Sequence, residues 1–254
     1  MDKRIGAQLY TVTKFLQTVE DFDESLRKVK EMGYETIQIS GSPLKAEEMK
    51  PIVDKYGLKV VVTHRDYEEF VENPQEIIEY NRILGCDICG MSMMPKANRE
   101  TSETLTEFIQ NLDKAAKTIC DAGLQFGYHN HAFEFAKIGG KSMMARILEE
   151  TDPNCMKFII DTYWLQFAGL NPAKFIHEQS DRVVAFHLKD LQVDKFNKVV
   201  MAEIGEGNMD WDDILAACEE SKAKWALVEQ DVCQRDPFES LKMSRDYLTA
   251  KGYR

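Results

Sequence analysis

Two histidines and a glutamate close a buried apolar run in residues 124–135, which read LQFGYHNHAFEF. A strand buried on both faces is normally apolar throughout, so His129, His131 and Glu134 conflict with burial at the end of this run. Conflicts of this kind tend to mark functional sites. We therefore expect a ligand to bind where this strand ends.

Three later apolar runs end in the same way. Asp161 closes the run KFIID, His187 the run VVAFH and Glu229 the run KWALVE. Because side chains alternate between the two faces of a strand, each of these residues shares a face with the small or branched residues before it. Two carboxylates and an imidazole suit Mn²⁺, Mg²⁺, Co²⁺ or Zn²⁺, with positions left open for substrate oxygens. We predict one divalent metal, whose fourth ligand is Glu134 or a histidine of residues 124–131.

The elements that must position these residues are eight apolar runs, each followed by an amphipathic segment. The expected strands are residues 5–12, 35–40, 59–66, 87–94, 124–131, 157–164, 183–190 and 224–231. The expected helices are residues 23–33, 46–57, 73–85, 102–123, 141–152, 171–181, 210–222 and 236–252. Eight strand-then-helix units in about 250 residues predict an α/β protein with a single (β/α)₈ TIM barrel over residues 1–254.

An open doubly wound sheet is the rival fold, but it usually carries a glycine-rich loop after its first strand, and QLYTVTKF has none. In a TIM barrel the active site lies at the C-terminal ends of the strands, where the polar residues above occur. Residues 192–211 are expected to form a loop over the barrel mouth.

Composition excludes several classes of function. The net charge of −11 disfavours nucleic acid as a partner, because phosphate binding draws on clustered lysine and arginine. No apolar stretch resembles a signal sequence or a membrane span of about 20 residues, so we expect a cytoplasmic protein without membrane contact. Cys86 and Cys89 form a CxxC pair without a second pair at zinc-site spacing, and we interpret them as small buried hydrophobic residues.

The ordered segments YHNHAFEF, IIDTYW, FHLKD, GEGNMDW and LVEQD make the chain similar to the xylose isomerase-like barrels of sugar phosphate isomerases and epimerases. In that family a Glu, an Asp, a His and a second Glu hold one divalent metal. The resemblance assigns three of these ligands to Asp161, His187 and Glu229. Many family members keep the first Glu inside the fifth strand, where this chain has Gly127. We expect Glu134 to fold back into that space, with His131 as the alternative ligand.

The resemblance also implies the chemistry. We expect an isomerase or epimerase that removes a proton next to a metal-bound carbonyl, with Glu134 and Glu229 as the acid and base. A lyase or dehydratase of a keto-sugar or keto-inositol is the alternative, because the same enediolate can expel a β-substituent. An endonuclease IV-type DNA repair enzyme and a non-catalytic sugar-binding barrel are more distant alternatives. Tyr163 and Trp164 replace a histidine of the ketose epimerases, which argues against a simple ketose 3-epimerase.

The expected substrate is a small sugar or sugar phosphate, and the sequence is also compatible with a homo-oligomer. Hydroxyl groups would bind to Gln8, Gln38 and His64, or else these residues form polar packing in the barrel core. The expected role of His129 and His131 is to orient the substrate or the groups around the metal ligands. Trp164 would cover the apolar side of a sugar ring, or else pack beneath the loop that follows its strand. Lys189 would bind an oxygen or a phosphate, or else form a surface ion pair with Asp190 or Glu206.

Overall fold

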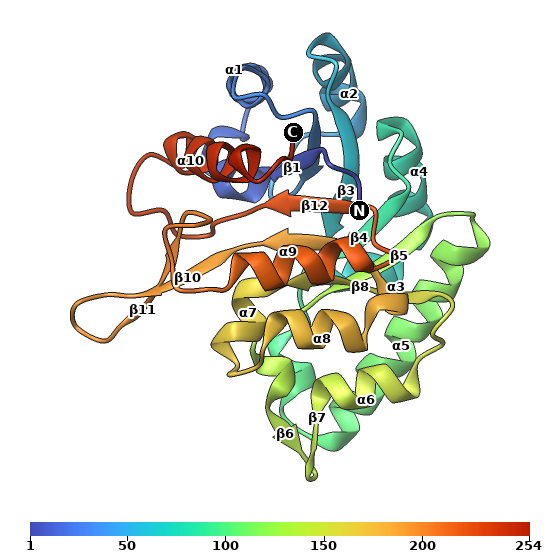
Figure 1. Ribbon diagram of the computed structural model, residues 1–254. Coiled ribbons are helices and arrows are strands. Elements are labelled where there is room, and N and C mark those ends of the chain that lie inside the picture. Colours follow the sequence, from blue (N-terminus) through green and yellow to red (C-terminus); the bar gives the residue numbers. More distant parts are fainter.

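Eight parallel strands close into a barrel in the computed structural model, which describes residues 1–254 (Figure 1). The last strand pairs with the first, with Ala7 opposite Val228, so the predicted (β/α)₈ TIM barrel is confirmed. The barrel strands are β1 (Ile5–Gln8), β2 (Thr36–Ile39), β3 (Lys59–Arg65), β4 (Ile88–Met91), β5 (Gln125–His129), β8 (Met156–Asp161), β9 (Val183–Leu188) and β12 (Trp225–Val228).

Eight helices return along the outside of the barrel, and each overlaps an expected segment. They are α1 (Val19–Glu31), α2 (Ala46–Lys55), α4 (Pro74–Leu84), α5 (Ser102–Asp121), α6 (Met143–Glu150), α8 (Pro172–Glu178), α9 (Trp211–Glu220) and α10 (Pro237–Ala250). Their starts follow capping chemistry: Thr18, Asn171 and Asp236 accept hydrogen bonds from amides of the first turn. None of the helices has the length and apolar character needed to cross a lipid bilayer.

Shorter helices, 3₁₀ turns and strands lie between the barrel strands and the eight outer helices. They are the helices α3 (Tyr67–Glu72) and α7 (Thr162–Phe167), the 3₁₀ turns η1 (Leu9–Phe15), η2 (Lys96–Arg99), η3 (Phe133–Phe135) and η4 (Ser180–Arg182), and the small strands β6 (Lys137–Ile138) and β7 (Lys141–Ser142). Most of them follow the C-terminal ends of barrel strands. The segments that frame the barrel mouth are therefore ordered structure rather than plain loops.

The prediction of a loop over residues 192–211 was wrong for the first part of that segment. An antiparallel hairpin of β10 (Asp190–Val193) and β11 (Val199–Ala202) follows β9 and projects away from the barrel (Figure 1). The apolar residues on both sides of the turn pair across it, and Asn197 takes the left-handed conformation (φ 62°) that the turn needs.

The interior of the barrel beneath its mouth is filled by side chains. Branched and aromatic side chains fill the interior: Val61, Val62, Ile88, Ile159, Val184, Ala185, Trp225 and Leu227. Gly127 accommodates this packing, because a Cβ there would lie 2.8 Å from Cγ1 of Ile159. The interior is a packed core, so ligands have access only to the ends of the strands.

Candidate active site

Four buried side chains converge at the C-terminal ends of adjacent strands: His129 from β5, Asp161 from β8, His187 from β9 and Glu229 just after β12. One potential ligand atom from each lies within 4.8 Å of all the others. These strands are consecutive neighbours in the barrel, so their ends meet at one side of the mouth. The group contains two nitrogen ligands and two carboxylates, a set that suits a first-row divalent metal.

Hydrogen bonds orient both imidazoles. Nδ1 of His129 lies 3.1 Å from the carbonyl oxygen of Ser92, which leaves Nε2 facing Asp161 Oδ2 at 3.2 Å. Nε2 of His187 lies 2.8 Å from Oε1 of Gln38. The outer nitrogen of each ring is thus engaged, and the inner one points into the group, as is common for metal-binding histidines.

The buried polar atoms of the group fit a bound cation. Nδ1 of His187 and Oε2 of Glu229 lie 2.9 Å apart, but neither makes an aligned hydrogen bond. Lys189 Nζ contacts the same Glu229 oxygen at 2.9 Å, but two buried acceptors that face each other remain costly unless an ion or a proton lies between them. The residues present therefore fit one divalent metal held by His129, Asp161, His187 and Glu229.

Lys189 lies beside this group and is almost fully buried. Its Nζ is 3.0 Å from Asp161, 2.9 Å from Glu229 and 2.9 Å from Asp231. Three carboxylates and one ammonium leave a charge of −2 when the histidines are neutral, which one divalent cation would balance. Lys189 thus bridges carboxylates inside the site, and the expected alternative of a surface pair with Asp190 or Glu206 is not formed.

The pKa values of the site follow from these contacts. Burial would raise the pKa of Glu229, but the charges of Lys189 and His187 hold it well below its usual range. Burial alone would lower the pKa of Lys189, but the surrounding carboxylates raise it well above the ordinary value. Burial and the nearby Glu229 raise the pKa of Asp231 to about 6. Glu229 is thus a carboxylate, and Lys189 carries its proton.

A cavity of about 440 Å³ opens over the group. Its lining is mostly polar and includes Ser40, His64, Ser92, His131 and Asp231. Burial lowers the pKa of His131 to about 2, so this ring is neutral and its Nδ1 has no hydrogen-bond partner. Nε2 of His64 also lacks a partner. Both rings line the cavity, but these two nitrogens are themselves buried, so a small ligand would contact other atoms of the rings.

Glu134 does not join the four-residue group. It is fully buried, and its carboxylate accepts hydrogen bonds from Tyr128 Oη at 2.7 Å and from the His131 amide at 2.9 Å. Tyr128 points into the core between the strands and the helices, so η3 turns Glu134 towards the outside of β5. The space beside Gly127 is filled by Ile159 and Val184. His129 occupies the fourth position instead.

Three other residues expected to bind substrate lie outside the cavity lining. Gln8 is buried and donates to Ser40 Oγ at 2.9 Å, while Gln38 bonds to His187. Trp164 packs against Tyr163, with ring centroids 4.8 Å apart, and near His131 at 5.4 Å. By contrast, His64, His129, His131 and Lys189 line the cavity.

Asp231 is a site residue that our sequence analysis did not select. It lies two positions after Glu229 and therefore on the same face of the extended chain, where it contacts Lys189. That spacing was the available signal. Ser40 and Ser92 also line the cavity, but single serines after a strand carry no comparable signal.

Comparison with known proteins agrees with this architecture. Residues 26–250 match the model of the xylose isomerase-like TIM barrel family. Inosose dehydratase of Geobacillus kaustophilus is 25% identical, with 89% of this chain and 86% of that protein covered. A sugar phosphate isomerase/epimerase from Parabacteroides distasonis superimposes with a TM-score of 0.82 at 22% identity, covering 98% of this chain and 94% of that one.

A third similar structure is a xylose isomerase-like TIM barrel protein from Mycobacterium smegmatis in complex with magnesium. It has a TM-score of 0.75 and 13% identity, with 98% of this chain and 97% of that chain covered. The fold and the family match define the class: this chain belongs to the xylose isomerase-like TIM barrel family.

Proposed function

We propose that this protein is a divalent-metal-dependent enzyme that removes a proton from the carbon next to the carbonyl of a small sugar or sugar phosphate. The observation that carries the proposal is the buried group of His129, Asp161, His187 and Glu229 beneath an open polar cavity. Such a site offers a Lewis acid, a carboxylate base and hydrogen-bonding groups for hydroxyls in one place. No other part of the molecule combines these features.

The roles of the chain's own residues follow from their positions. A bound divalent metal would polarise the substrate carbonyl and make the neighbouring C–H more acidic. Glu229 is ionised at neutral pH and is our candidate for the base that takes this proton. The ammonium of Lys189 would stabilise negative charge that develops on a substrate oxygen. His64 and His131 would bind and orient hydroxyl groups.

The arrangement of carboxylates favours chemistry on one face of the substrate. Glu229 and Asp231 lie on the same side of the cavity, both in contact with Lys189. Glu134, the expected second base, faces away from the cavity. Epimerisation by two carboxylates needs one on each face of the reacting carbon. Proton transfer between neighbouring carbons, as in aldose–ketose isomerisation, needs only one face, and we propose this outcome.

Dehydration of a keto-inositol or keto-sugar is the second candidate, and the same geometry favours it. Glu229 would take the proton, and Asp231, in the protonated form that its raised pKa of about 6 favours, would give a proton to the departing hydroxyl group on the same face, so that water leaves. The similarity to inosose dehydratases at 25% identity supports this candidate. The two candidates share their first step and differ only in which bond breaks next.

The test is a screen of ketoses, ketose phosphates and keto-inositols in D₂O with added Mn²⁺, Mg²⁺, Co²⁺ or Zn²⁺. We expect one substrate to gain deuterium at the carbon next to its carbonyl, and Glu229→Gln to abolish this exchange. An aldose product from a ketose supports isomerisation, an epimeric ketose supports epimerisation, and an unsaturated product supports dehydration. Turnover without deuterium in the product would exclude proton abstraction by Glu229, because a direct hydride shift retains the substrate hydrogen.

A further inference from the structure

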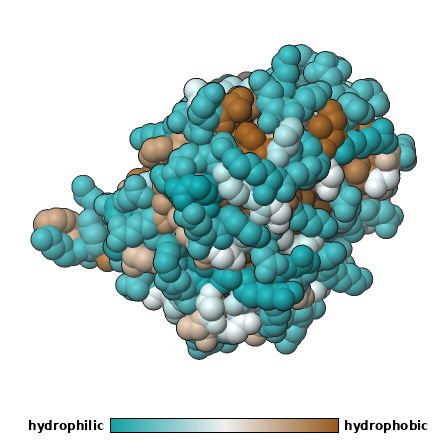
Figure 2. Space-filling model, turned by 90° about the horizontal axis from the view of Figure 1, so that it is seen from above, coloured by the Kyte–Doolittle hydropathy of each residue, from teal (hydrophilic) through white to brown (hydrophobic).

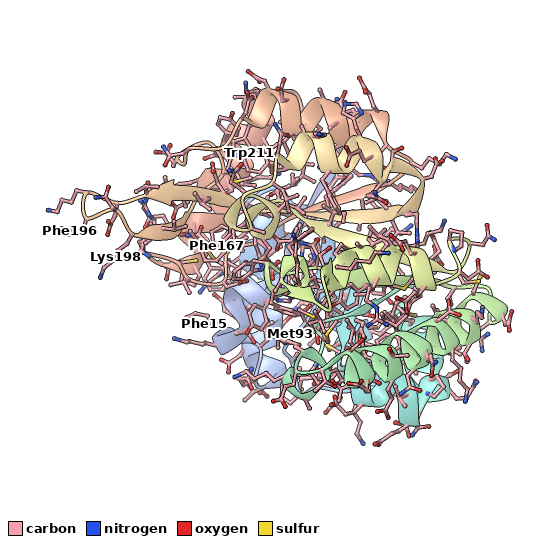
Figure 3. The ribbon with its side chains drawn as sticks, turned by 90° about the horizontal axis from the view of Figure 1, so that it is seen from below. Phe15, Met93, Phe167, Phe196, Lys198 and Trp211 are labelled. Carbon is pink, nitrogen blue, oxygen red and sulfur yellow. The ribbon has the colours of Figure 1, made fainter.

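The large hydrophobic side chains exposed on this molecule all lie at one end of the barrel. Each lies between the end of a barrel strand and the first turn of the helix that returns along the barrel, a region that we call the mouth face. Figure 3 shows four of them, Phe15, Met93, Phe167 and Phe196. The full set is Tyr10, Phe15, Val19, Val71, Met93, Phe167, Val193, Phe196, Val199 and Val232. Apolar side chains gathered on one face indicate an interaction surface.

The hairpin β10–β11 carries the most exposed members of this set. Val193 lies directly opposite Val199 in the hairpin, and their side chains are 49% and 43% exposed. Phe196, at the tip, is 69% exposed and points away from the body of the molecule (Figure 3). Figure 2 shows the same hairpin standing out from an otherwise rounded surface. Leu191 and Met201 anchor the base of the hairpin in the main core. Its distal part, with the exposed valines and Phe196, lacks packing that a partner would supply.

Charge distinguishes the hairpin tip from the rest of this acidic chain. Lys195 and Lys198 flank Phe196, and neither makes an ion pair. Asp194, whose carboxylate accepts hydrogen bonds from the amides of Phe196 and Lys198, offsets one of the two lysines and leaves the tip with a net charge of +1. The tip is therefore a basic and apolar knob.

A complementary surface exists on the same mouth face, on α3. Glu68 and Glu72 are exposed and make no ion pair, whereas their neighbour Glu69 pairs with Arg65. Val71, between the two free carboxylates, is 41% exposed. This face of α3 has the apolar centre and the negative charges that would receive the hairpin tip.

The two surfaces lie on opposite sides of the barrel. The hairpin follows β9 and α3 follows β3, and these strands are four places apart in the closed ring of eight. A hairpin that projects along the barrel axis cannot reach α3 of its own chain across the mouth. Two barrels can meet mouth to mouth, related by a two-fold axis. If this axis is perpendicular to the line that joins the hairpin to α3 across the mouth, the hairpin of each chain faces α3 of the other chain.

We propose that the mouth face is a dimer interface, in which the β10–β11 hairpin of each chain packs on α3 of a second copy. A two-fold axis forms both contacts at once, so the basic hairpin tip of each chain packs against the acidic face of α3 in the other chain. Asp66 and Glu69 line the cavity next to α3, so the arriving hairpin tip would also narrow the entrance to the site. This proposal is independent of the reaction proposed above.

The first test is the mass of the full-length protein in sedimentation velocity, from low to high micromolar concentration. We expect a species of two 29.2 kDa chains that dissociates on dilution. Phe196→Ser should weaken the dimer by about tenfold or more, because it removes the apolar contact at the tip. Thermal unfolding of the variant checks that the tip substitution leaves the fold intact. A monomer at all concentrations would overturn the proposal.

Charge exchange then locates the interface. Lys195→Glu with Lys198→Glu should weaken the dimer, and so should Glu68→Lys with Glu72→Lys, because each creates like-charge contacts. All four substitutions together should restore it, because the charges are complementary again. Lys174→Glu in α8, where the side chain is 75% exposed on the flank of the barrel, is the matched control and should change nothing. A dimer insensitive to the paired reversals, or one not restored by their combination, would place the interface elsewhere.

Discussion

At the scale of single residues, the choice between His129 and Glu134 decides how the metal is held. His129 directs Nε2 into the group, whereas Glu134 is engaged by Tyr128 and the His131 amide. We expect His129→Ala to lower metal affinity by about 10-fold to 100-fold or more, because it removes a ligand. Glu134→Gln should keep the metal. Elemental analysis and titration calorimetry of both variants measure this. If Glu134→Gln lost the metal and His129→Ala kept it, η3 would have to rearrange when the metal binds.

Glu134 should also make the stability of the protein depend on pH. Burial raises the pKa of Glu134 from its ordinary value of 4.5 to about 7, although the hydrogen bond from the Tyr128 hydroxyl opposes the shift. Between these two values the folded state binds more protons than the unfolded chain, so the free energy of unfolding falls as pH rises and is level above pH 7. The loss is on the order of 3 kcal/mol.

Glu134→Gln tests this dependence because glutamine has no charge to desolvate. Compared with the parent protein, the variant should gain relative stability as pH rises from about 5 to about 8. Denaturant unfolding at several pH values measures the difference. A constant difference between parent and variant across this range would show that Glu134 does not titrate there.

At the scale of elements, Asp190 ties the segment after the hairpin to the barrel. Its carboxylate accepts hydrogen bonds from the amides of Gly205 and Gly207 and from the indole N–H of Trp211, the last at 2.6 Å. Gly207 must lack a side chain here, because a Cβ would lie 2.2 Å from Oδ1 of Asp190. One buried carboxylate therefore fixes the turn that leads into α9.

We expect Asp190→Ala to lower the free energy of unfolding by about 2–4 kcal/mol, because it leaves the buried indole N–H of Trp211 and two part-buried amides without their acceptor. Asp194→Asn, in the hairpin turn, is the control. Its Oδ1 can still accept the hydrogen bonds from Phe196 and Lys198, so its effect should stay within about 0.5 kcal/mol. Urea unfolding of the two variants compares them directly. Equal losses would mean that the Asp190 network contributes little.

At the scale of the whole molecule, metal binding should stabilise the barrel. Four strands contribute ligands to one site, so an ion that binds only the folded state links their ends. At a free metal concentration of about 100 times Kd the gain is about 2.7 kcal/mol, which corresponds to a rise in Tm of roughly 5–10 °C. Differential scanning calorimetry with a chelator and with added metal measures it.

Asp161→Asn is the matched control for this stabilisation, because it removes a ligand charge from the fully buried group. Its Tm should be the same with chelator and with metal. An equal rise of Tm in the parent and in this variant would indicate that the metal binds at another place on this acidic chain.

The sequence by itself determined the barrel and most of the metal group. Alternating strands and helices specify a parallel sheet. Every second residue of a strand points to the same face of the sheet, so the sequence also indicates which residues share a face. Asp161, His187 and Glu229 could therefore be placed at strand ends from local pattern alone. For the fourth position our sequence analysis preferred Glu134, with His131 as the alternative, and expected His129 to contact the substrate.

Only the tertiary structure decided which residues meet across strands and around the mouth. The burial of Glu134 against Tyr128 depends on a turn of η3, and the three carboxylates around Lys189 come from the ends of two strands, β8 and β12. The projection of the hairpin opposite α3 depends on the closed ring of strands. Apart from Tyr128 and Glu134, which are six positions apart, these contacts join residues far apart in the chain, and their distances are set by the packing of the whole barrel. Local periodicity carries no information about them.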